Sequence, residues 1–307
     1  HAEKAIKILD LSDPKKYMEK LEEAQILHKC SHKNIVEINE ANIFNVSGQL
    51  KVILDLEYIP LGSLEKAMEN RYVPISESVN HMLDVLSGLE YAHSQGFLHR
   101  DIKPGNILIG NNITKLSDFG LATSFSASSC GSPQGYTTHL APEFFKTNST
   151  TILTDIFAAG LTFYRIIENI SNWRTLTRSL PKLLDYIQNG KLISQIGFSE
   201  YTPQSIKRII NKACNPDPDK RYQTAHEMSQ SLSKLRFNIS WVKIDETHWS
   251  GIKDDDLYEL KCNNSRKNFK IEFFKNNRRQ SSECKLCTDF SEAMKIMHNI
   301  IAKTTLK

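Results

Sequence analysis

The feature that most constrains this chain is a polar segment from His99 to Asn106 (HRDIKPGN), with Asp118-Phe119-Gly120 following 12 positions after Asn106 (118 − 106 = 12). Either motif alone is a credible chance match, but their order and spacing together make chance negligible. Carboxylate and carboxamide oxygens on two separate loops suit a hard cation such as magnesium. We therefore expect the fold to bring the two segments together.

These motifs resemble those of the eukaryotic-type serine/threonine protein kinases, an H-R-D-x-x-x-x-N loop followed by D-F-G. The resemblance implies an α+β, two-lobed kinase fold that transfers the γ-phosphate of ATP, with Mg2+, to protein hydroxyl groups. It implies that Asp101 orients the acceptor hydroxyl and takes its proton. It also implies that Asn106 and Asp118 bind magnesium and that Lys103 contacts the γ-phosphate. Lys103 further favours serine or threonine over tyrosine as the acceptor.

Small-molecule kinases that modify antibiotics or choline have a similar aspartate–asparagine loop, but two further features favour protein kinases. An Ala-Pro-Glu motif ends at Glu143, and Asp155 opens an apolar helical run. The resemblance implies a buried ion pair between Glu143 and Arg221, and hydrogen bonds from the catalytic-loop backbone to Asp155. Both are expected to be scaffold contacts.

The first predicted strand, AIKIL, contains Lys7, which matches the kinase lysine that holds the α- and β-phosphates of ATP. Its expected ion-pair partner is Glu23, in a helix predicted over residues 13–29. Glu22 is the rival, and Glu23 is preferred because Leu27, four residues later, then shares its helical face. This ion pair would mark an active arrangement.

Glu57 and Ile59 follow an apolar strand and resemble the hinge whose backbone binds the adenine of ATP, with Leu56 controlling the inner pocket. Leu108 and Val52 are equally consistent with plain core positions, and neither is assigned to adenine.

Apolar periodicity predicts an architecture of three parts. Residues 1–59 form a kinase N-lobe that lacks its first strands, residues 60–236 a helical C-lobe, and residues 237–307 a small α+β accessory domain. The accessory domain is expected to have three or four strands packed by one terminal helix. The remaining strands are predicted over 34–38, 51–58, 240–244, 256–261 and 269–274, and helices over 79–93, 154–168, 204–214 and 289–304.

Two departures from the kinase pattern stand out. No segment matches the Gly-rich loop expected roughly 15–20 residues before Lys7. Tyr136 and His139 replace the threonine and tyrosine that commonly precede Ala-Pro-Glu. The alternative is a pseudokinase or scaffold that uses the fold for partner binding, but the intact metal and phosphate residues favour an enzyme with an upstream segment.

Arg100, beside Asp101, resembles the arginine of kinases that are activated by phosphorylation of the loop between Asp-Phe-Gly and Ala-Pro-Glu, where the new phosphate pairs with that arginine. No single phosphosite is chosen. The candidate hydroxyl groups belong to Ser124, Ser126, Ser128, Ser129, Ser132, Thr137 and Thr138.

The resemblance implies a protein substrate and ATP as partners, and the accessory domain has a possible partner or regulatory ligand. The net charge of +4 is spread along the chain, and the basic and aromatic residues at 266–279 are read as a solvated sheet face, so nucleic acid is not an expected partner. No run approaches the roughly 18 apolar residues of a membrane span, and a cytoplasmic location with reduced thiols is expected. Cys284 and Cys287 have the spacing of half a zinc knuckle, but without a second pair they favour core packing.

Overall fold

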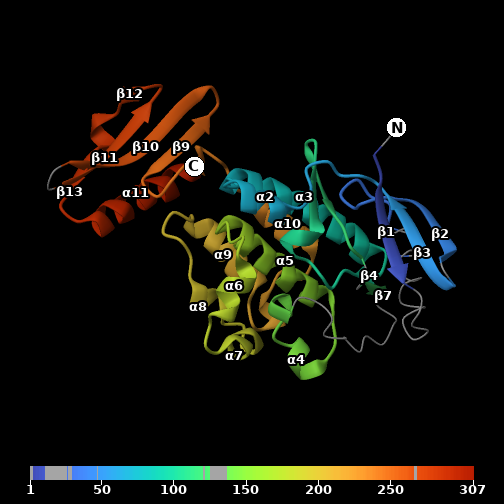
Figure 1. Cartoon of the computed structure of the whole chain (residues 1–307). Coiled ribbons are helices and arrows are strands. Elements are labelled where there is room, and N and C mark those ends of the chain that lie inside the picture. Colours follow the sequence, from blue (N-terminus) through green and yellow to red (C-terminus); the bar gives the residue numbers. More distant parts are fainter. Residues whose placement is uncertain are drawn as a thin grey trace.

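The computed structural model describes residues 3–10, 26, 30–46, 48–119, 122–124, 137–265 and 268–307. An N-lobe sheet, a helical C-lobe and an accessory domain follow one another, and the N-lobe sheet and the accessory domain lie at opposite sides of the C-lobe (Figure 1). The strands are β1 Ala5–Asp10, β2 Ile38–Val46, β3 Gln49–Leu56, β4 Phe97–Leu98, β5 Ile107–Gly110, β6 Ile113–Leu116, β7 Thr123–Ser124, β8 Ser240–Lys243, β9 His248–Lys253, β10 Asp256–Ser265, β11 Asn268–Lys275, β12 Arg278–Arg279 and β13 Lys285–Cys287. The α-helices are α2 Leu64–Asn70, α3 Ile75–Ser94, α4 Phe144–Thr147, α5 Ile152–Ile167, α6 Trp173–Arg178, α7 Leu183–Gln188, α8 Leu192–Ile196, α9 Gln204–Ala213, α10 Ala225–Ser233 and α11 Phe290–Thr305. The 3-10 turns are η1 Pro104–Asn106, η2 Thr137–His139, η3 Pro218–Lys220 and η4 Ser281–Glu283.

The N-lobe sheet has the antiparallel order β1-β3-β2, and the first predicted strand is confirmed as β1. The strand predicted at 34–38 is wrong, because β2 starts at Ile38 and runs to Val46. Residues 34–36 pair with the end of β6 instead: Val36 N donates to Leu116 O at 3.0 Å, and Leu116 N donates to Asn34 O at 2.8 Å. Of the helix predicted over 13–29, only Ile26 and Cys30 nearby are described, and Ile26 is helical.

The C-lobe is built around α3 and α5, both long and apolar as predicted. Chain reversal after α3 takes place at Gly96, whose φ of +80° favours glycine. Helix α5 meets α9 at Gly160, where an added Cβ would lie 2.6 Å from the Cβ of Ala213. The two helices can approach this closely only because position 160 has no side chain.

The accessory domain is a six-stranded sheet of order β12-β11-β10-β9-β8, with β13 also beside β11, and α11 packs on one face. The predicted helix is confirmed: Asp289 caps it by accepting from Glu292 N at 2.8 Å, and Ala293, Met297 and Ile301 are buried. The prediction of three or four strands is wrong. Strand β9 escaped notice because its inward position 251 is glycine, which breaks the apolar alternation.

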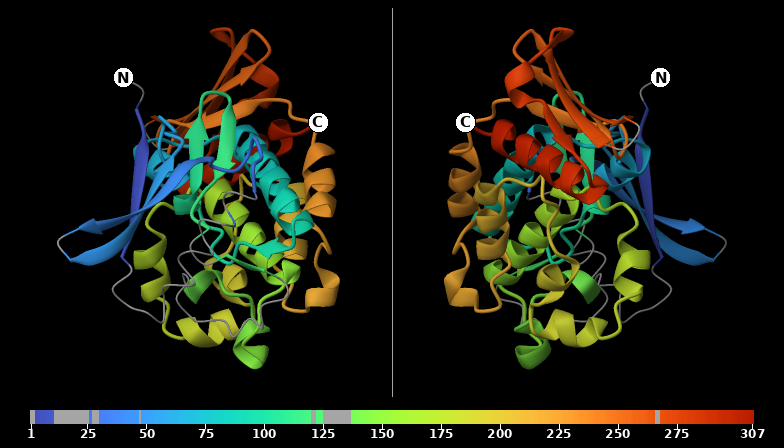
Figure 2. Two further views of the ribbon diagram at one scale, coloured as in Figure 1. Left: turned by 90° about the vertical axis from the view of Figure 1, so that its right-hand side faces the viewer. Right: turned by 90° about the vertical axis from the view of Figure 1, so that its left-hand side faces the viewer.

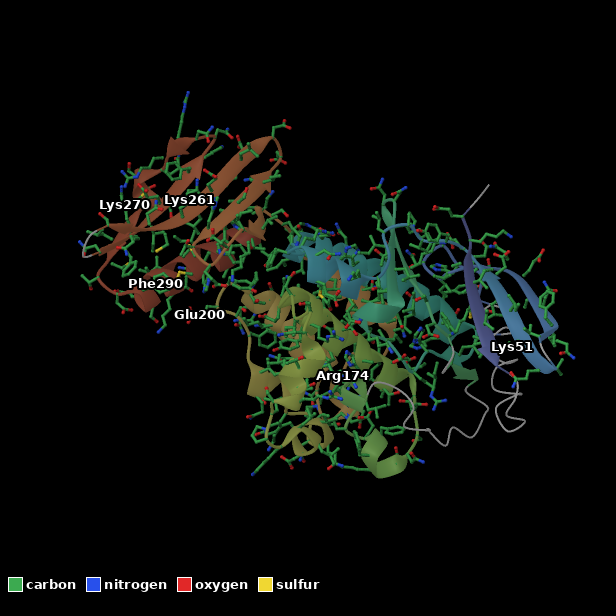
Figure 3. All side chains as sticks on the ribbon, in the orientation of Figure 1. Lys51, Arg174, Glu200, Lys261, Lys270 and Phe290 are labelled. Atoms are coloured by element: carbon green, nitrogen blue, oxygen red, sulfur yellow. The ribbon has the colours of Figure 1, made fainter. Side chains whose placement is uncertain are left out.

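The other face of this sheet carries charged pairs. Lys261 lies 3.0 Å from Glu259, and Lys270 lies 2.7 Å from Glu272. Figure 3 labels both lysines on the accessory sheet, above the helix that begins at Phe290. These contacts agree with the interpretation of a solvated sheet face over an aromatic core.

In the described ranges the cysteines are free, and Cys262 and Cys287 are buried in the accessory core. Nowhere in those ranges do three or more His, Cys, Asp or Glu side chains gather as a metal site, so the zinc interpretation gains no support. Among the helices of the described residues, none is both long and apolar enough to cross a membrane.

The buried apolar residues form two clusters, one in the N- and C-lobes and one of accessory-domain residues that also includes Tyr201 of the C-lobe. The domain boundaries at 59/60 and 236/237 remain our proposal, and the second cluster supports the later of the two.

Candidate active site

The loop from His99 to Asn106 is fixed at its start by Asp155, the acidic residue in the first turn of α5. Its two carboxylate oxygens accept hydrogen bonds from His99 N and Arg100 N, each at 2.8 Å, so the expected scaffold contact is confirmed. His93 Nε2 also lies 2.9 Å from Asp155. Burial would raise the pKa of Asp155, but the hydrogen bonds and charges of His93 and His99 outweigh it and lower the pKa. Arg100, at φ +69°, adopts the left-handed conformation that this grip requires.

Asp101 is the centre of a tight polar group. Its oxygen Oδ2 accepts from Lys103 Nζ at 2.6 Å and from Asn106 Nδ2 at 2.9 Å, and only 8% of the residue is exposed. Asn106 Nδ2 also donates to Asp101 O at 2.8 Å. The fold therefore brings these three sequence-predicted residues into direct contact.

Asp118 is placed next to this group by the residue before it. Ser117 donates from both N and Oγ to Asn106 O, at 2.9 and 3.0 Å. Phe119 is fully buried, with its ring 4.6 Å from that of His99 in an edge-on contact. Between them Asp118 has φ +61°, a backbone conformation that is costly for a residue other than glycine.

Lys7 reaches the same place from the N-lobe. Its Nζ lies 2.7 Å from Asp118 Oδ1, so β1 and Asp118 meet between the two lobes. Glu23, the predicted partner of Lys7, lies outside the described residues, and that ion pair stays a prediction.

A cavity of about 300 Å3 opens between the lobes. Five sequence-predicted residues line it: Lys7, Leu56, Glu57, Asn106 and Asp118. Ile59 is not among its lining residues. The others that line it are Ala5, Val36, Gly105, Leu108 and Ser117.

Ala5 could have been found from the sequence, because it is two residues before Lys7 on strand β1. Leu108, which the sequence left unassigned, lies on strand β5 and lines the same cavity. Alternate residues of a strand share a face, so a lining residue predicts another two positions away. Val52, by contrast, is buried core at 1% exposure.

The segment predicted as a hinge is fixed by polar contacts. Glu57 N donates to Glu37 O at 2.9 Å, and Glu57 Oε2 accepts from Lys115 Nζ at 2.6 Å. The oxygen of Ile59 accepts from Gly62 N at 3.3 Å. Glu57 therefore faces the cavity with its carboxylate already paired, and a role of Ile59 in binding adenine through its backbone stays a prediction.

The donor set suits magnesium. Asn106 uses its nitrogen for Asp101, so its oxygen Oδ1 is the atom that remains for a metal, and Asp118 offers a carboxylate from the same cavity. Hard cations prefer such oxygen ligands. When bound, the metal would neutralise charge on the phosphates of a nucleotide, while Lys7 supplies a further cation on the N-lobe side.

The model of the protein kinase domain family matches residues 1–232. The chain belongs to the protein kinase family. It is 33% identical over 238 residues to the serine/threonine-protein kinase TOS3 of Saccharomyces cerevisiae, and this match covers 66% of the present chain and 42% of TOS3. It is 32% identical over 221 residues to serine/threonine-protein kinase PknG of Mycobacterium leprae, with 68% of this chain and 26% of the relative covered. For serine/threonine-protein kinase DCLK3 of Homo sapiens, the identity is 29% over 236 residues, with 74% of this chain and 35% of the relative covered. The chain thus spans less than half the length of these curated relatives.

The kinase Ala-Pro-Glu segment is fixed as expected. Arg221 donates to both carboxylate oxygens of Glu143 at 2.7 Å, and also to Asn215 O and Leu153 O at 2.7 and 2.8 Å. The side chain of Arg221 is fully buried, so the predicted ion pair is confirmed.

His139, which departs from the usual kinase tyrosine, is buried against Trp173 with ring centroids 5.8 Å apart. Trp173 Nε1 donates to Thr138 Oγ1 at 2.9 Å, so this hydroxyl is engaged in packing. The remaining candidate phosphosites, Ser124, Ser126, Ser128, Ser129, Ser132 and Thr137, have side chains outside the described part of the structure.

Two buried histidines make the stability of this kinase lobe depend on pH. Burial lowers the pKa of His99 and lowers that of His139 far below its usual value, with Arg165 and Lys103 adding to the effect at His139. Both are neutral in the folded chain but gain a proton in the unfolded chain below about pH 6.5. The contribution of these two histidines to the free energy of unfolding is therefore fully present above about pH 6.5 and is lost as the pH falls. Each histidine that stays neutral contributes a slope of about 1.4 kcal/mol per pH unit.

We expect the free energy of unfolding, measured in urea, to fall as the pH is lowered from 7.5 to 5.5. We expect His139→Phe to reduce the slope of this free energy against pH by about 1.4 kcal/mol per pH unit, the contribution of one histidine. His226→Phe is the matched control, because the side chain of His226 is 57% exposed. An unchanged slope in His139→Phe would contradict the assignment.

Proposed function

We propose that this chain is a protein serine/threonine kinase that transfers the γ-phosphate of ATP, with Mg2+, to hydroxyl groups of protein substrates, including its own. The observation that carries the proposal is the contact of Asp101 with Lys103 and Asn106 beside a cavity that Asn106 shares with Asp118 and Lys7. Its members are the groups that phosphoryl transfer requires: a base for the acceptor, oxygen ligands for a metal, and cations for the phosphates. Belonging to the kinase family and similarity to named serine/threonine kinases support the same function.

The chemistry assigned to this chain's own residues follows from their placement. Asp101 holds the acceptor hydroxyl in line and takes its proton, while Lys103 stabilises the negative charge on the transferred group. Lys103 already sits 2.6 Å from Asp101, so one local contact fixes both residues. We also propose serine or threonine as the acceptor, on the basis of Lys103, and a cytoplasmic location, on the basis of the free thiols.

The proposal is tested by incubating the purified chain with labelled ATP, Mg2+ and a generic serine- and threonine-rich protein. Phosphate incorporation that a chelator abolishes is the expected result. Lys7→Met is expected to raise the KM for ATP by about tenfold or more, because it removes a charge-assisted contact worth about 1.5–3 kcal/mol. Lys51→Met is the matched control on the neighbouring strand β3, where Figure 3 labels Lys51 at the outer end of the N-lobe sheet.

The same experiment separates the enzyme from a scaffold. A rise in Tm with ATP and Mg2+ but no phosphate transfer would indicate a binding module, and neither effect would contradict the proposed function altogether.

A further inference from the structure

The short helix α2 begins directly on the catalytic segment. Ile109 N, on the strand that follows Asn106, donates to Gly62 O at 2.8 Å, and Ser63 pairs with Leu108 as an isolated antiparallel bridge. Ser63 then caps α2 by accepting from Lys66 N at 3.2 Å. The start of α2 and one wall of the nucleotide cavity are therefore joined through the backbone.

Side chains tighten the same joint. Glu65, in the first turn of α2, accepts from the buried Arg165 at 2.7 Å. Its second carboxylate oxygen lies 2.9 Å from where a Cβ on Gly105 would be, and Gly105 is the neighbour of Asn106. Because the contact is that close, a shift of α2 toward the loop displaces Gly105, and a shift away opens a gap under Asn106.

The other end of α2 leads directly to Tyr72. The helix ends where Arg71 N donates to Ala67 O at 2.9 Å. Beyond Tyr72 the backbone of Val73 is clamped in both directions by Asn169, with Val73 N donating to Oδ1 at 2.6 Å and Nδ2 donating to Val73 O at 3.0 Å. With Val73 fixed to the C-lobe, a displacement of the Tyr72 ring must be taken up by the preceding residues, which are the last turn of α2.

The position of the Tyr72 ring is set by the accessory domain. Trp249, fully buried on β9, meets Tyr72 edge-on with ring centroids 5.4 Å apart. Close beside them, Ser76 Oγ and Ser240 Oγ are 2.6 Å apart. The view in Figure 2 from two sides places the accessory domain directly over this end of the C-lobe.

Trp249 has a second aromatic neighbour that is not attached to α2. Tyr201 precedes α9, and its ring lies 5.0 Å from Trp249 and 5.5 Å from His298. The neighbouring Glu200 is labelled in Figure 3 at the edge of the C-lobe that faces the accessory domain. Tyr72 and Tyr201 thus contact the same tryptophan and also hydrogen-bond to each other through their side chains, but only Tyr72 continues into the segment that carries Asn106.

We propose that Trp249 is a positioning residue for phosphoryl transfer: through Tyr72 and α2, the accessory domain sets the position of the segment that carries Gly105 and Asn106. The activity readout of this proposal rests on the proposed kinase function, whereas its structural readout does not. Coupling of this kind changes a property at the second site by about fivefold or more.

The test compares three full-length variants by kcat and by amide hydrogen exchange. Tyr72→Ala removes the ring that transmits the contact, Tyr72→Phe keeps the ring, and Ser240→Ala removes the contact between the accessory domain and Ser76 on α3, outside α2. We expect Tyr72→Ala to lower kcat by about fivefold or more, and the other two to stay within about twofold of the wild type. We also expect Tyr72→Ala alone to speed exchange at the amides of Asn106 and Ser117, which donate to Lys103 O and Asn106 O at 2.9 Å.

Each other outcome overturns the proposal. Equal losses in Tyr72→Ala and Ser240→Ala would mean that docking matters but that α2 does not transmit it. Unchanged exchange at Asn106 in Tyr72→Ala would mean that no coupling exists. If the wild-type chain transfers no phosphate, the proposed function fails, and hydrogen exchange still decides the coupling.

Discussion

Asp101→Asn is expected to lower the rate of phosphate transfer by about 10²–10⁴-fold, the range that a general base contributes. The asparagine has the same size as aspartate and its oxygen can still accept the hydrogen bond from Lys103 at 2.6 Å, so the loop geometry is kept while the proton acceptor is lost. Steady-state kinetics with labelled ATP measures the effect. Urea unfolding of the same variant checks that the fold is retained.

The matched control is Asp185→Asn, which makes the same chemical change at an exposed position on α7. It is expected to leave the rate unchanged. Full activity in Asp101→Asn would remove the catalytic assignment of this residue and, with it, the main support for an enzyme.

Arg221→Met is expected to lower the free energy of unfolding by about 3–5 kcal/mol, because it leaves the Glu143 carboxylate without its buried partner. Arg221 also donates hydrogen bonds to the backbone oxygens of Asn215 and Leu153, so methionine would leave these acceptors without this donor as well. Urea unfolding followed by circular dichroism measures the change.

Lys220→Met, one residue earlier, is the matched control. Lys220 lies 3.1 Å from Asp217 with 69% of its side chain exposed, and such surface pairs contribute about 0–1 kcal/mol. If the two variants lost similar stability, the Glu143–Arg221 pair would not be a principal anchor of the C-lobe.

The residues that chemistry constrains were the ones most fully predictable from the sequence. Asp101, Lys103 and Asn106 are brought together as expected, and Asp118 lines the same cavity as Asn106, because each is proposed for a role that only a few side chains can fill. The contact of Lys7 with Asp118 was not predicted, since the two residues are 111 positions apart in sequence and belong to different lobes.

The failures have physical causes of a different kind. Strand β2 is exposed on both faces for most of its length, so it carries no apolar alternation that would place it after residue 38. Strand β9 was hidden by Gly251, where an added Cβ would lie 2.6 Å from Ile239 Cγ2, so the inward position is filled by a neighbour rather than by its own side chain. Tertiary packing decides both cases, and local sequence carries no signal of it.

The joint at Gly160 has a consequence for motion between the lobes. Helices α5 and α9 interlock there, and Asp155 at the start of α5 grips the backbone of His99 and Arg100, so the loop with Asp101 moves with the helical block. Lys7 belongs to the separate sheet of the N-lobe. A rotation of the small lobe would therefore stretch the salt bridge between Lys7 and Asp118 while the spacing of Asp101 and Asn106 stayed constant, so Lys7, and not the proposed proton acceptor Asp101, is the group whose position such a rotation would change.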